Sequence, residues 1–247
     1  MKVNISSCLK GDFSLKDIKF KLESGEILGV IGNSGSGKTT LIKSLMGNYK
    51  FKGEVSLGGT VINNLTTLEK SQHISYALQE NSETNLTVFE NCISGRSPFM
   101  NWRESEEDKS IVEEILRDLN LIKFRDRAVS SLSRGERKRV NIARALSKDA
   151  PVIIIDDLTD NLDMKNALDI VLALKCRVKK QNIKTIVVIN DLSLASSFCD
   201  KFLFLKDGNQ IKFGGIELIN SKSISDLLEI KIKVEKKNEK NYVRLVV

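Results

Sequence analysis

The sequence predicts an α/β fold built on a phosphate-binding loop and a mixed sheet, and two stretches carry this prediction. The apolar run Ile27–Ile31 has the composition of a buried strand and leads into Gly32–Thr40, which fits the pattern GxxxxGK[ST]. A second β-branched run, Pro151–Ile155, ends in the carboxylates Asp156 and Asp157. Continuous apolar strands are typical of parallel sheets covered on both faces. Ligands bind such sheets at the carboxyl ends of the strands.

Composition limits the class of protein. A chain of 247 residues with 41% apolar residues can form one large α/β domain or two lobes. No apolar run approaches the roughly 18 to 20 residues of a membrane helix, and the first residues lack the apolar core of a signal peptide. We therefore expect a cytoplasmic protein. Its four scattered cysteines lack zinc-ligand spacing, which predicts buried, reduced thiols.

The net charge of +7 is spread along the chain, and aromatic residues make up only 6% of it. This distribution does not favour a nucleic-acid partner. A mild positive excess suits work against an anionic membrane surface equally well.

The loop Gly32–Thr40 predicts binding of a nucleoside triphosphate. Its three glycines allow successive N–H groups to face one anion, and the helix that opens at Lys38 adds the positive end of its dipole. Lys38 would contact the β and γ phosphates, while the Thr39 hydroxyl would ligate Mg²⁺. A Gly/Ser turn without a ligand is the alternative interpretation. The residues assigned to the nucleotide here are Gly32, Asn33, Ser34, Gly35, Ser36, Gly37, Lys38, Thr39 and Thr40.

The two carboxylates after the second strand predict the metal-binding and catalytic edge of the same site. Asp156 would hold the Mg²⁺ shell through water, and Asp157 stands where a base for the attacking water is expected. An acidic strand end that caps the following turn is the alternative, and the phosphate loop makes it the weaker one.

Between these stretches, Leu132–Leu146 has the sequence LSRGERKRVNIARAL. Here the chain resembles the ATP-binding cassette (ABC) family, whose signature LSGGQ is followed by a helix of the form RVxxARAL. The resemblance spans nearly the whole chain, because six motifs occur in the family's order. Besides the phosphate loop, the signature and the Asp156 strand, they are a Q-loop at Tyr76–Glu80, a D-loop at Asn161–Asp163 and a switch strand Ile186–Ile189 that leads into Asn190.

The resemblance implies the division of the chain into parts. It implies a RecA-like P-loop NTPase core over about residues 1–82 and 150–215, a helical subdomain over about 83–149, and a C-terminal helix and β-hairpin over about 216–247. Within the subdomain, Ile111–Leu119 has a helical period that Leu121–Phe124 continues. In the tail, Ile230–Val234 and Tyr242–Val247 predict the two strands, with Lys236–Lys240 as their turn.

The resemblance also implies ATP and Mg²⁺ as ligands and assigns roles to residues. Signature residues Ser133, Gly135 and Glu136, with Asp163 of the D-loop, would bind the ATP held by a second subunit in a head-to-tail dimer. Gln79 would join Thr39 and Asp156 at the metal, and the catalytic group would be Lys38, Gln79, Asp157 and Asn190. Ser133 and Glu136 also have the spacing of a capping box.

Two departures from the family pattern concern hydrolysis. Asp157 stands in the place of a glutamate, and one methylene less moves the carboxylate back by about 1.5 Å. Asn190 stands in the place of a histidine and cannot carry positive charge. We therefore expect a working but slow ATPase.

Three further departures concern binding and the backbone. Leu9 falls where an aromatic residue stacks on adenine in the family, which leaves Phe13 as the nearby aromatic candidate. Arg134 replaces the first signature glycine, which either strains that turn or adds a charge toward phosphate. Leu158 replaces a proline.

A second, narrower resemblance suggests which process the ATPase drives. Asn85–Cys92, followed by Gly95–Pro98, resembles the LTVxENV…GRxP pattern of iron-siderophore, haem and cobalamin importers, and Asn190–Ala195 follows their HDLNLA form except at the first residue. The implied partners are a second ABC subunit, a membrane permease that faces Leu86–Trp102 and, indirectly, a substrate-binding protein, at the inner face of the cell membrane. A catalytically weak member of a heterodimer and a soluble Fe–S-assembly type of ATPase remain alternatives.

Overall fold

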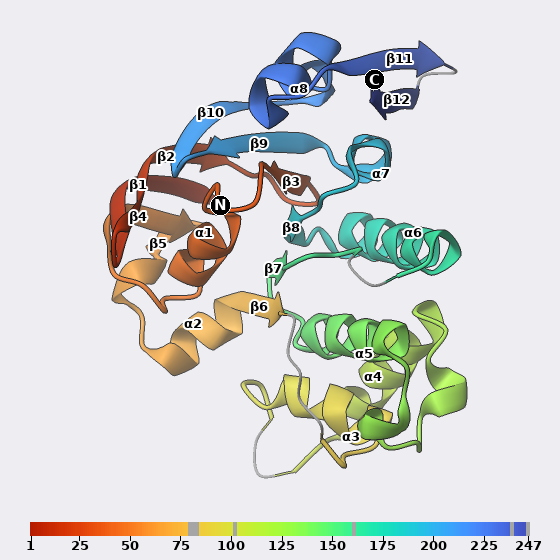
Figure 1. Ribbon diagram of the computed structural model, residues 1–247. Coiled ribbons are helices and arrows are strands. Elements are labelled where there is room, and N and C mark those ends of the chain that lie inside the picture. Colours follow the sequence, from red (N-terminus) through yellow and green to blue (C-terminus); the bar gives the residue numbers. More distant parts are fainter. Residues whose placement is uncertain (79–83, 101–102, 160–161, 238–239, 246–247) are drawn as a thin grey trace. The chain divides into compact units, whose positions relative to one another are not determined.

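The computed structural model describes residues 1–78, 84–100, 103–159, 162–237 and 240–245 (Figure 1). The chain divides into two compact units. One, the two-segment unit, consists of Met1–Leu65 and Lys184–Val247, and the other, the central unit, consists of Thr66–Ile183. None of the helices in these described ranges is long and apolar enough to cross a membrane.

The two-segment unit contains most of the strands. Their order in the sheet is β5-β4-β1-β2-β10-β9-β3-β8. The strands are β1 (Lys2–Lys10), β2 (Phe13–Lys21), β3 (Ile27–Ile31), β4 (Phe51–Leu57), β5 (Thr60–Val61), β8 (Lys184–Val188), β9 (Lys201–Lys206) and β10 (Asn209–Gly214). The helices are α1 (Lys38–Leu45), α7 (Leu192–Phe198) and α8 (Ser221–Leu228), with 3-10 turns at Ile62–Asn64 and Ile216–Leu218.

Strand β3, which leads into the predicted phosphate loop, lies between β8 and β9 and is parallel to both (Figure 1). All five of its residues are buried, as its uninterrupted apolar sequence predicts. The pairs β1–β2, β1–β4 and β9–β10 are antiparallel. The sheet is therefore mixed, as predicted.

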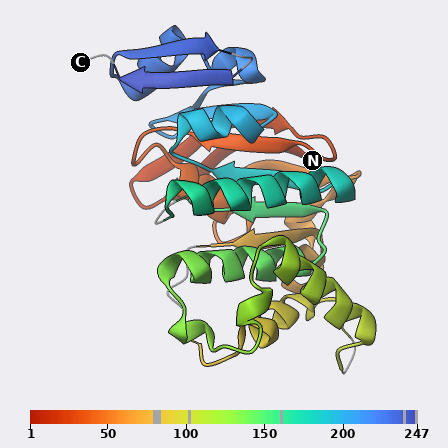
Figure 2. The same ribbon diagram turned by 90° about the vertical axis from the view of Figure 1, so that its right-hand side faces the viewer.

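The end of the chain forms a separate antiparallel hairpin of β11 (Ile232–Lys237) and β12 (Lys240–Leu245), which is visible beside α8 in Figure 2. Two serines of α7 hold β12: Ser193 Oγ accepts from the N–H of Val243 at 3.2 Å, and Ser196 Oγ donates to the carbonyl of Asn241 at 3.2 Å. Both strands extend into Lys236–Lys240, which the sequence predicted to be their turn, because β11 ends at Lys237 and β12 begins at Lys240.

The central unit is mostly helical. Its helices are α2 (Thr67–His73), α3 (Val88–Ile93), α4 (Glu106–Asp118), α5 (Arg134–Ser147) and α6 (Met164–Gln181). Three 3-10 turns lie at Ser94–Arg96, Ile122–Phe124 and Val129–Ser131. Strands β6 (Ile74–Ala77) and β7 (Val152–Ile155) form a parallel pair. Helix α5 packs against both α3 and α4 (Figure 1).

One expectation about the central unit was wrong. Helix α4 ends at Asp118, and Leu121–Phe124 does not continue it. Asn120 adopts a left-handed backbone with φ +55°, which turns the chain after α4. Asparagine accepts this conformation more easily than most residues, so a single side chain ends an otherwise continuous apolar period.

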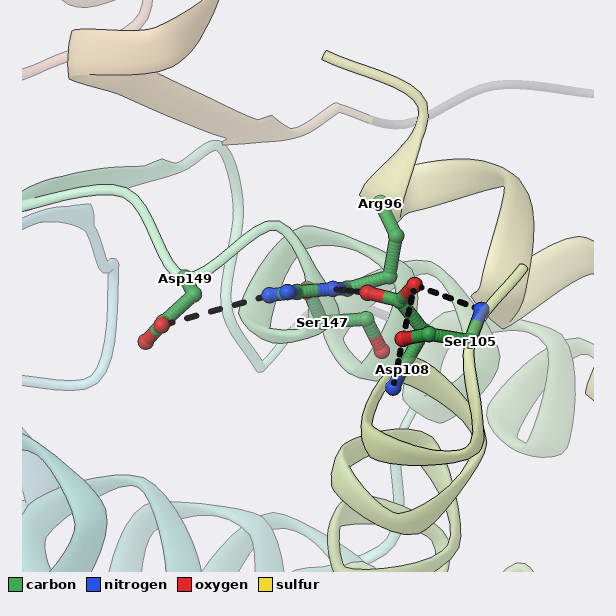
Figure 3. Close-up of polar contacts among 5 residues, drawn as sticks. All are labelled: Arg96, Ser105, Asp108, Ser147 and Asp149. Atoms are coloured by element: carbon green, nitrogen blue, oxygen red, sulfur yellow. Dashed lines mark hydrogen bonds and ion pairs between the residues drawn. The ribbon is translucent and has the colours of Figure 1, made fainter. Parts of the chain in front are cut away.

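A buried arginine ties three parts of the central unit together (Figure 3). Arg96 Nε contacts Asp108 Oδ1 at 2.8 Å, and another guanidinium nitrogen donates to the carbonyl of Ser147 at 3.2 Å. Asp108 also closes a capping box with Ser105 at the start of α4. Arg96 and Asp108 are 9% and 6% exposed. The pair therefore joins the turn after α3, the start of α4 and the end of α5.

The four cysteines are free thiols, but they are not all buried. Cys8, Cys92 and Cys199 are buried, whereas Cys176 is exposed on α6. Burial raises the pKa of the Cys92 thiol to about 12. The expectation of buried thiols was thus wrong for Cys176.

Candidate functional site

The phosphate loop between β3 and α1 has a backbone that requires glycine at three positions. Gly35 and Gly37 have φ angles of +79° and +104°, in the region that other residues rarely adopt. A Cβ atom on Gly32 would lie 2.2 Å from the carbonyl oxygen of Leu205 and 2.5 Å from Ser36 Oγ. The loop can therefore curl closely only with glycine at these places.

The start of α1 suits an anion. Gly37 is its N-cap and provides no side-chain hydrogen bond, and the first turn contains no acidic residue. The N–H groups and the positive end of the helix dipole therefore face the loop without a carboxylate in the first turn of the helix. Ser36 Oγ is buried against Gly32 and has no hydrogen-bond partner in the described part of the chain. An anionic ligand in the loop would satisfy such a hydroxyl.

Lys38 places its ammonium group over this loop. Its Nζ donates to the carbonyl of Gly32 at 2.6 Å and to the carbonyl of Asn33 at 2.9 Å. The charge thus lies close to the position at which the loop would hold phosphate oxygens. Of the two following threonines, Thr39 is exposed and Thr40 is buried.

Two residues from other parts of the chain contact the phosphate loop. Asn33 Nδ2 donates to the carbonyl of Leu228, at the end of α8, across a long 3.4 Å. The ring of Phe13 lies so close to Gly37 that a Cβ there would be 3.0 Å from it. Leu9, in contrast, is 74% exposed. The aromatic candidate from the sequence therefore does lie at the phosphate loop, whereas Leu9 lies open to solvent.

The predicted switch residue shares an edge of the sheet with the phosphate loop. Val30 of β3 pairs with Val188 of β8 in parallel register. Asn190 follows Val188 by the same number of residues by which Gly32 follows Val30, so both leave the sheet at its carboxyl edge. Asn190 is exposed, and the next residue, Asp191, caps α7 by accepting from the N–H of Leu194 at 2.9 Å.

The predicted metal and base positions lie at the end of β7 in the central unit. Asp156 is 8% exposed, and its N–H donates to the carbonyl of Ala77 in β6 at 3.0 Å. Asp157 is half-buried and has a left-handed backbone with φ +51°. The following Leu158 is fully buried.

Lys138 of α5 contacts this strand end and was missed in the sequence. Its Nζ donates to the carbonyl oxygen of Asp157 and, at 3.3 Å, to that of Asp156. It thereby links the signature helix to the main chain of the two residues predicted for the metal and the base. The sequence held a weak signal, since Lys138 follows the signature on the helix that precedes β7.

The signature itself begins α5 in the way that its spacing predicts. Ser133 is the N-cap, its Oγ accepts from the N–H of Glu136 at 3.3 Å, and the Glu136 carboxylate accepts from the N–H of Ser133 at 2.8 Å. The backbone N–H of Ser133 holds the pKa of Glu136 below its usual range. Neither Arg134 nor Gly135 has a positive φ. The strain considered for Arg134 is therefore absent, and its side chain is exposed.

The D-loop aspartate has a local structural role. Asp163 is the N-cap of α6 and accepts from the N–H of Asn166 at 2.8 Å, which holds the pKa of Asp163 below its usual range. Gln79 and Asn161 lie outside the described residues. Among the residues that are described, no group of three or more His, Cys, Asp and Glu side chains is arranged to hold a metal ion.

Comparisons with known proteins agree with these features. A family model described as ABC transporter matches residues 15–160. An ABC transporter ATP-binding protein of Methanocaldococcus jannaschii, itself uncharacterised, is 36% identical over 222 residues, which are 90% of this chain and 87% of the relative. A petrobactin import ATP-binding protein of Bacillus subtilis is 29% identical over 236 residues, which are 94% and 93% of the two chains.

A solved structure is similar in fold as well as in sequence. It is the dimeric post-hydrolysis state of an ATP-binding cassette bound to ADP and Pi, with a TM-score of 0.75 and 28% identity over 87% of this chain and 97% of that one. The loop before α1, the signature helix and the acidic strand end are thus found in a chain whose relatives bind ATP. The protein is a member of the ABC transporter family, with the P-loop NTPase fold of an ATP-binding cassette.

Proposed function

We propose that this chain is the ATP-hydrolysing subunit of an ABC importer for an iron chelate or cobalamin. The observation that carries the proposal is the glycine-shaped loop in front of α1, whose N-terminus has neither a side-chain cap nor an acidic residue. Such a helix start binds phosphate. Lys38, which now donates to loop carbonyls, would turn to the β and γ phosphates of ATP.

The residues for a metal ion fit Mg²⁺. Thr39 offers a hydroxyl and Asp156 a carboxylate, and Mg²⁺ is usually held by one or two protein oxygens together with phosphates and waters. Gln79 is proposed as a third contact. When bound, Mg²⁺ neutralises charge that develops on the phosphates.

Asp157 would act as the base. Its carboxylate accepts a proton from a water molecule, the water oxygen bonds to the γ phosphorus, and the bond from that phosphorus to the oxygen of ADP breaks. Asn190 would donate an amide hydrogen bond to the γ phosphate. Because an amide carries no positive charge, it stabilises the transition state less than an imidazolium, and we expect slow hydrolysis by the isolated chain.

The second half of each ATP site would come from another cassette. Ser133, Gly135, Glu136 and Asp163 would contact the nucleotide on the partner, so that ATP holds a head-to-tail dimer together and hydrolysis releases it. The likeness to a dimeric cassette bound to ADP and Pi supports this assignment. Ser133 would have to exchange its hydrogen bond with Glu136 for one to the phosphate.

The transport role rests on the importer-like segment at Asn85–Pro98 and on the relative named for petrobactin import. Its partners would be membrane permease subunits and, through them, a substrate-binding protein, with the chain at the inner face of the cell membrane. We also propose the division into a core of about 1–82 and 150–215, a helical subdomain of about 83–149 and a tail. The uncharged Asn190 favours one second candidate, a weak member of a heterodimeric system.

Turnover of Mg²⁺-ATP by the purified chain, with and without the permease expressed from the same genome, tests the proposal. Lys38→Ala should abolish ATP binding, whereas Lys43→Ala, at the other end of α1, should not. Asp157→Asn should arrest hydrolysis and retain ATP, which light scattering would detect as an ATP-dependent dimer. Cells that lack the gene should lose uptake of either an iron chelate or cobalamin, and an uptake assay identifies which one. If these cells take up both at the normal rate, the importer assignment is contradicted.

A further inference from the structure

The backbone at Asp157 differs from that of its neighbours. With φ +51° it occupies the left-handed region, which Asp and Asn tolerate better than other residues that carry a Cβ. A proline at the next position would push residue 157 toward an extended conformation. Leu158 removes that restriction. The two substitutions relative to the family pattern, at positions 157 and 158, are therefore compatible with one and the same backbone conformation.

The flanks of Asp157 are fixed on both sides. The N–H of Asp156 is bonded to Ala77 in β6, and the side chain of Leu158 is fully buried. Between these anchors, the orientation of the peptide groups decides the direction in which the Asp157 side chain leaves the chain. A rotation of one peptide group would redirect the carboxylate without disturbing β7.

Lys138 holds these peptide groups. Its ammonium donates to the consecutive carbonyls of Asp156 and Asp157, and hydrogen bonds from a charged donor are stronger than those between neutral groups. Lys138 is half-buried on α5, so its side chain crosses from the signature helix to the strand end.

We propose that Lys138 is a positioning residue for hydrolysis. It fixes the left-handed backbone at residue 157 and so aims a carboxylate that is one methylene shorter than glutamate. This inference rests on the proposed function, in which Asp157 is the base. It implies that the backbone of this chain is adapted to the shorter acid, and that the uncharged Asn190 is what keeps hydrolysis slow.

The test compares three variants of the full chain by kcat and KM for Mg²⁺-ATP. Lys138→Met removes the donor and should lower kcat by about tenfold or more, because displacement of a reacting group by about 1 Å costs up to a hundredfold. KM should stay within about twofold, since Lys138 acts here through the main-chain carbonyls of Asp156 and Asp157 and is not among the residues assigned to ATP. Lys138→Arg should restore most of kcat. Lys148→Met is the matched control, because Lys148, the C-cap of α5, also donates to a main-chain carbonyl, that of Ile74 at 3.3 Å.

A double-variant measurement shows whether Lys138 acts through Asp157. If it does, adding Lys138→Met to Asp157→Asn should not lower the residual rate further. The inference would be overturned if Lys138→Met lowered kcat equally in the unaltered chain and in Asp157→Asn. An unchanged kcat in Lys138→Met, or a rise in KM alone, would overturn it as well.

Asp157→Glu provides a second test, which remains informative if Lys138→Met fails to fold. Glutamate accepts the left-handed region poorly, so this variant should lose kcat by at least about threefold and melt earlier than Asp157→Asn. A gain in kcat would overturn the inference. The proposed function fails separately, if the unaltered chain with its permease hydrolyses no ATP or if Asp157→Asn retains full turnover.

Discussion

Replacement of Arg96 by methionine should destabilise the protein strongly, although Arg96 lies outside the proposed ATP site. The guanidinium group is buried and contacts the equally buried carboxylate of Asp108 at 2.8 Å. Removal of one partner from a buried ion pair costs about 3 to 5 kcal/mol, because the remaining charge stays buried.

The contacts in Figure 3 place the expected cost near the lower end of that range. Without Arg96, the Asp108 carboxylate keeps the N–H and the hydroxyl of Ser105, at 3.0 and 2.7 Å. The second acidic neighbour, Asp149, is 3.9 Å away with a side chain that is 57% exposed, so its loss adds little. The carbonyl of Ser147 loses one donor. We therefore expect a loss of about 3 kcal/mol.

Urea unfolding followed by circular dichroism measures this loss. With a slope of about 3 kcal/mol per molar, the midpoint of Arg96→Met should fall by about 1 M. Lys109→Met is the matched control, since Lys109 also pairs with a carboxylate at 2.8 Å, that of Glu106, but at the surface. It should cost less than about 0.5 kcal/mol. Adding Asp108→Asn to Arg96→Met should recover part of the loss. Equal midpoints for Arg96→Met and Lys109→Met would refute the reasoning.

Three further outcomes follow from the contacts described above. Gly32→Ala should weaken ATP binding by at least about a hundredfold, or about 2.7 kcal/mol, since its Cβ would overlap the carbonyl of Leu205. Gly215→Ala, whose Cβ would meet the flexible side chain of Glu217, should leave the affinity for ATP unchanged. Titration calorimetry of the two variants compares these affinities. Asn190→His should raise kcat by about tenfold at an unchanged affinity for ATP, and a lower kcat would contradict the account of slow hydrolysis. The N–H of Ser105 holds the pKa of Asp108 below its ordinary value, so Asp108 stabilises the fold above about pH 4 and loses this effect as the pH falls further. The difference in unfolding free energy between Asp108→Asn and the unaltered protein should accordingly shrink from pH 5 to pH 2, and a constant difference would contradict the linkage.

The features that the sequence predicted well are those encoded by neighbouring residues. The strand, loop and helix around Gly32–Thr40 follow from a local pattern, as does the capping box of Ser133 and Glu136. Each needs only a few consecutive side chains and the hydrogen bonds of one helix end. Local chemistry of this kind is available before any tertiary contact forms.

The features that escaped prediction depend on distant packing or on a single backbone angle. The contact of Lys138 with the carbonyls of Asp156 and Asp157 exists only because α5 lies beside the end of β7. Arginines are usually exposed, so nothing local marked Arg96 as a buried partner of Asp108. The left-handed φ angle at Asn120, which turns the chain after α4, leaves no trace in the spacing of the apolar residues.

The two-segment unit is assembled from both ends of the sequence, and this has a consequence for folding during synthesis. Strand β3 emerges early in translation, but its two neighbours in the sheet, β8 and β9, belong to the segment synthesised after the whole central unit. The central unit is continuous and can fold on the ribosome as soon as it has emerged, whereas contacts between distant segments form late and slowly. The phosphate loop is thus encoded near the start of the chain and acquires its shape near the end of synthesis. During that interval the fully apolar β3 lacks its sheet partners, and this is the stretch on which a chaperone would act.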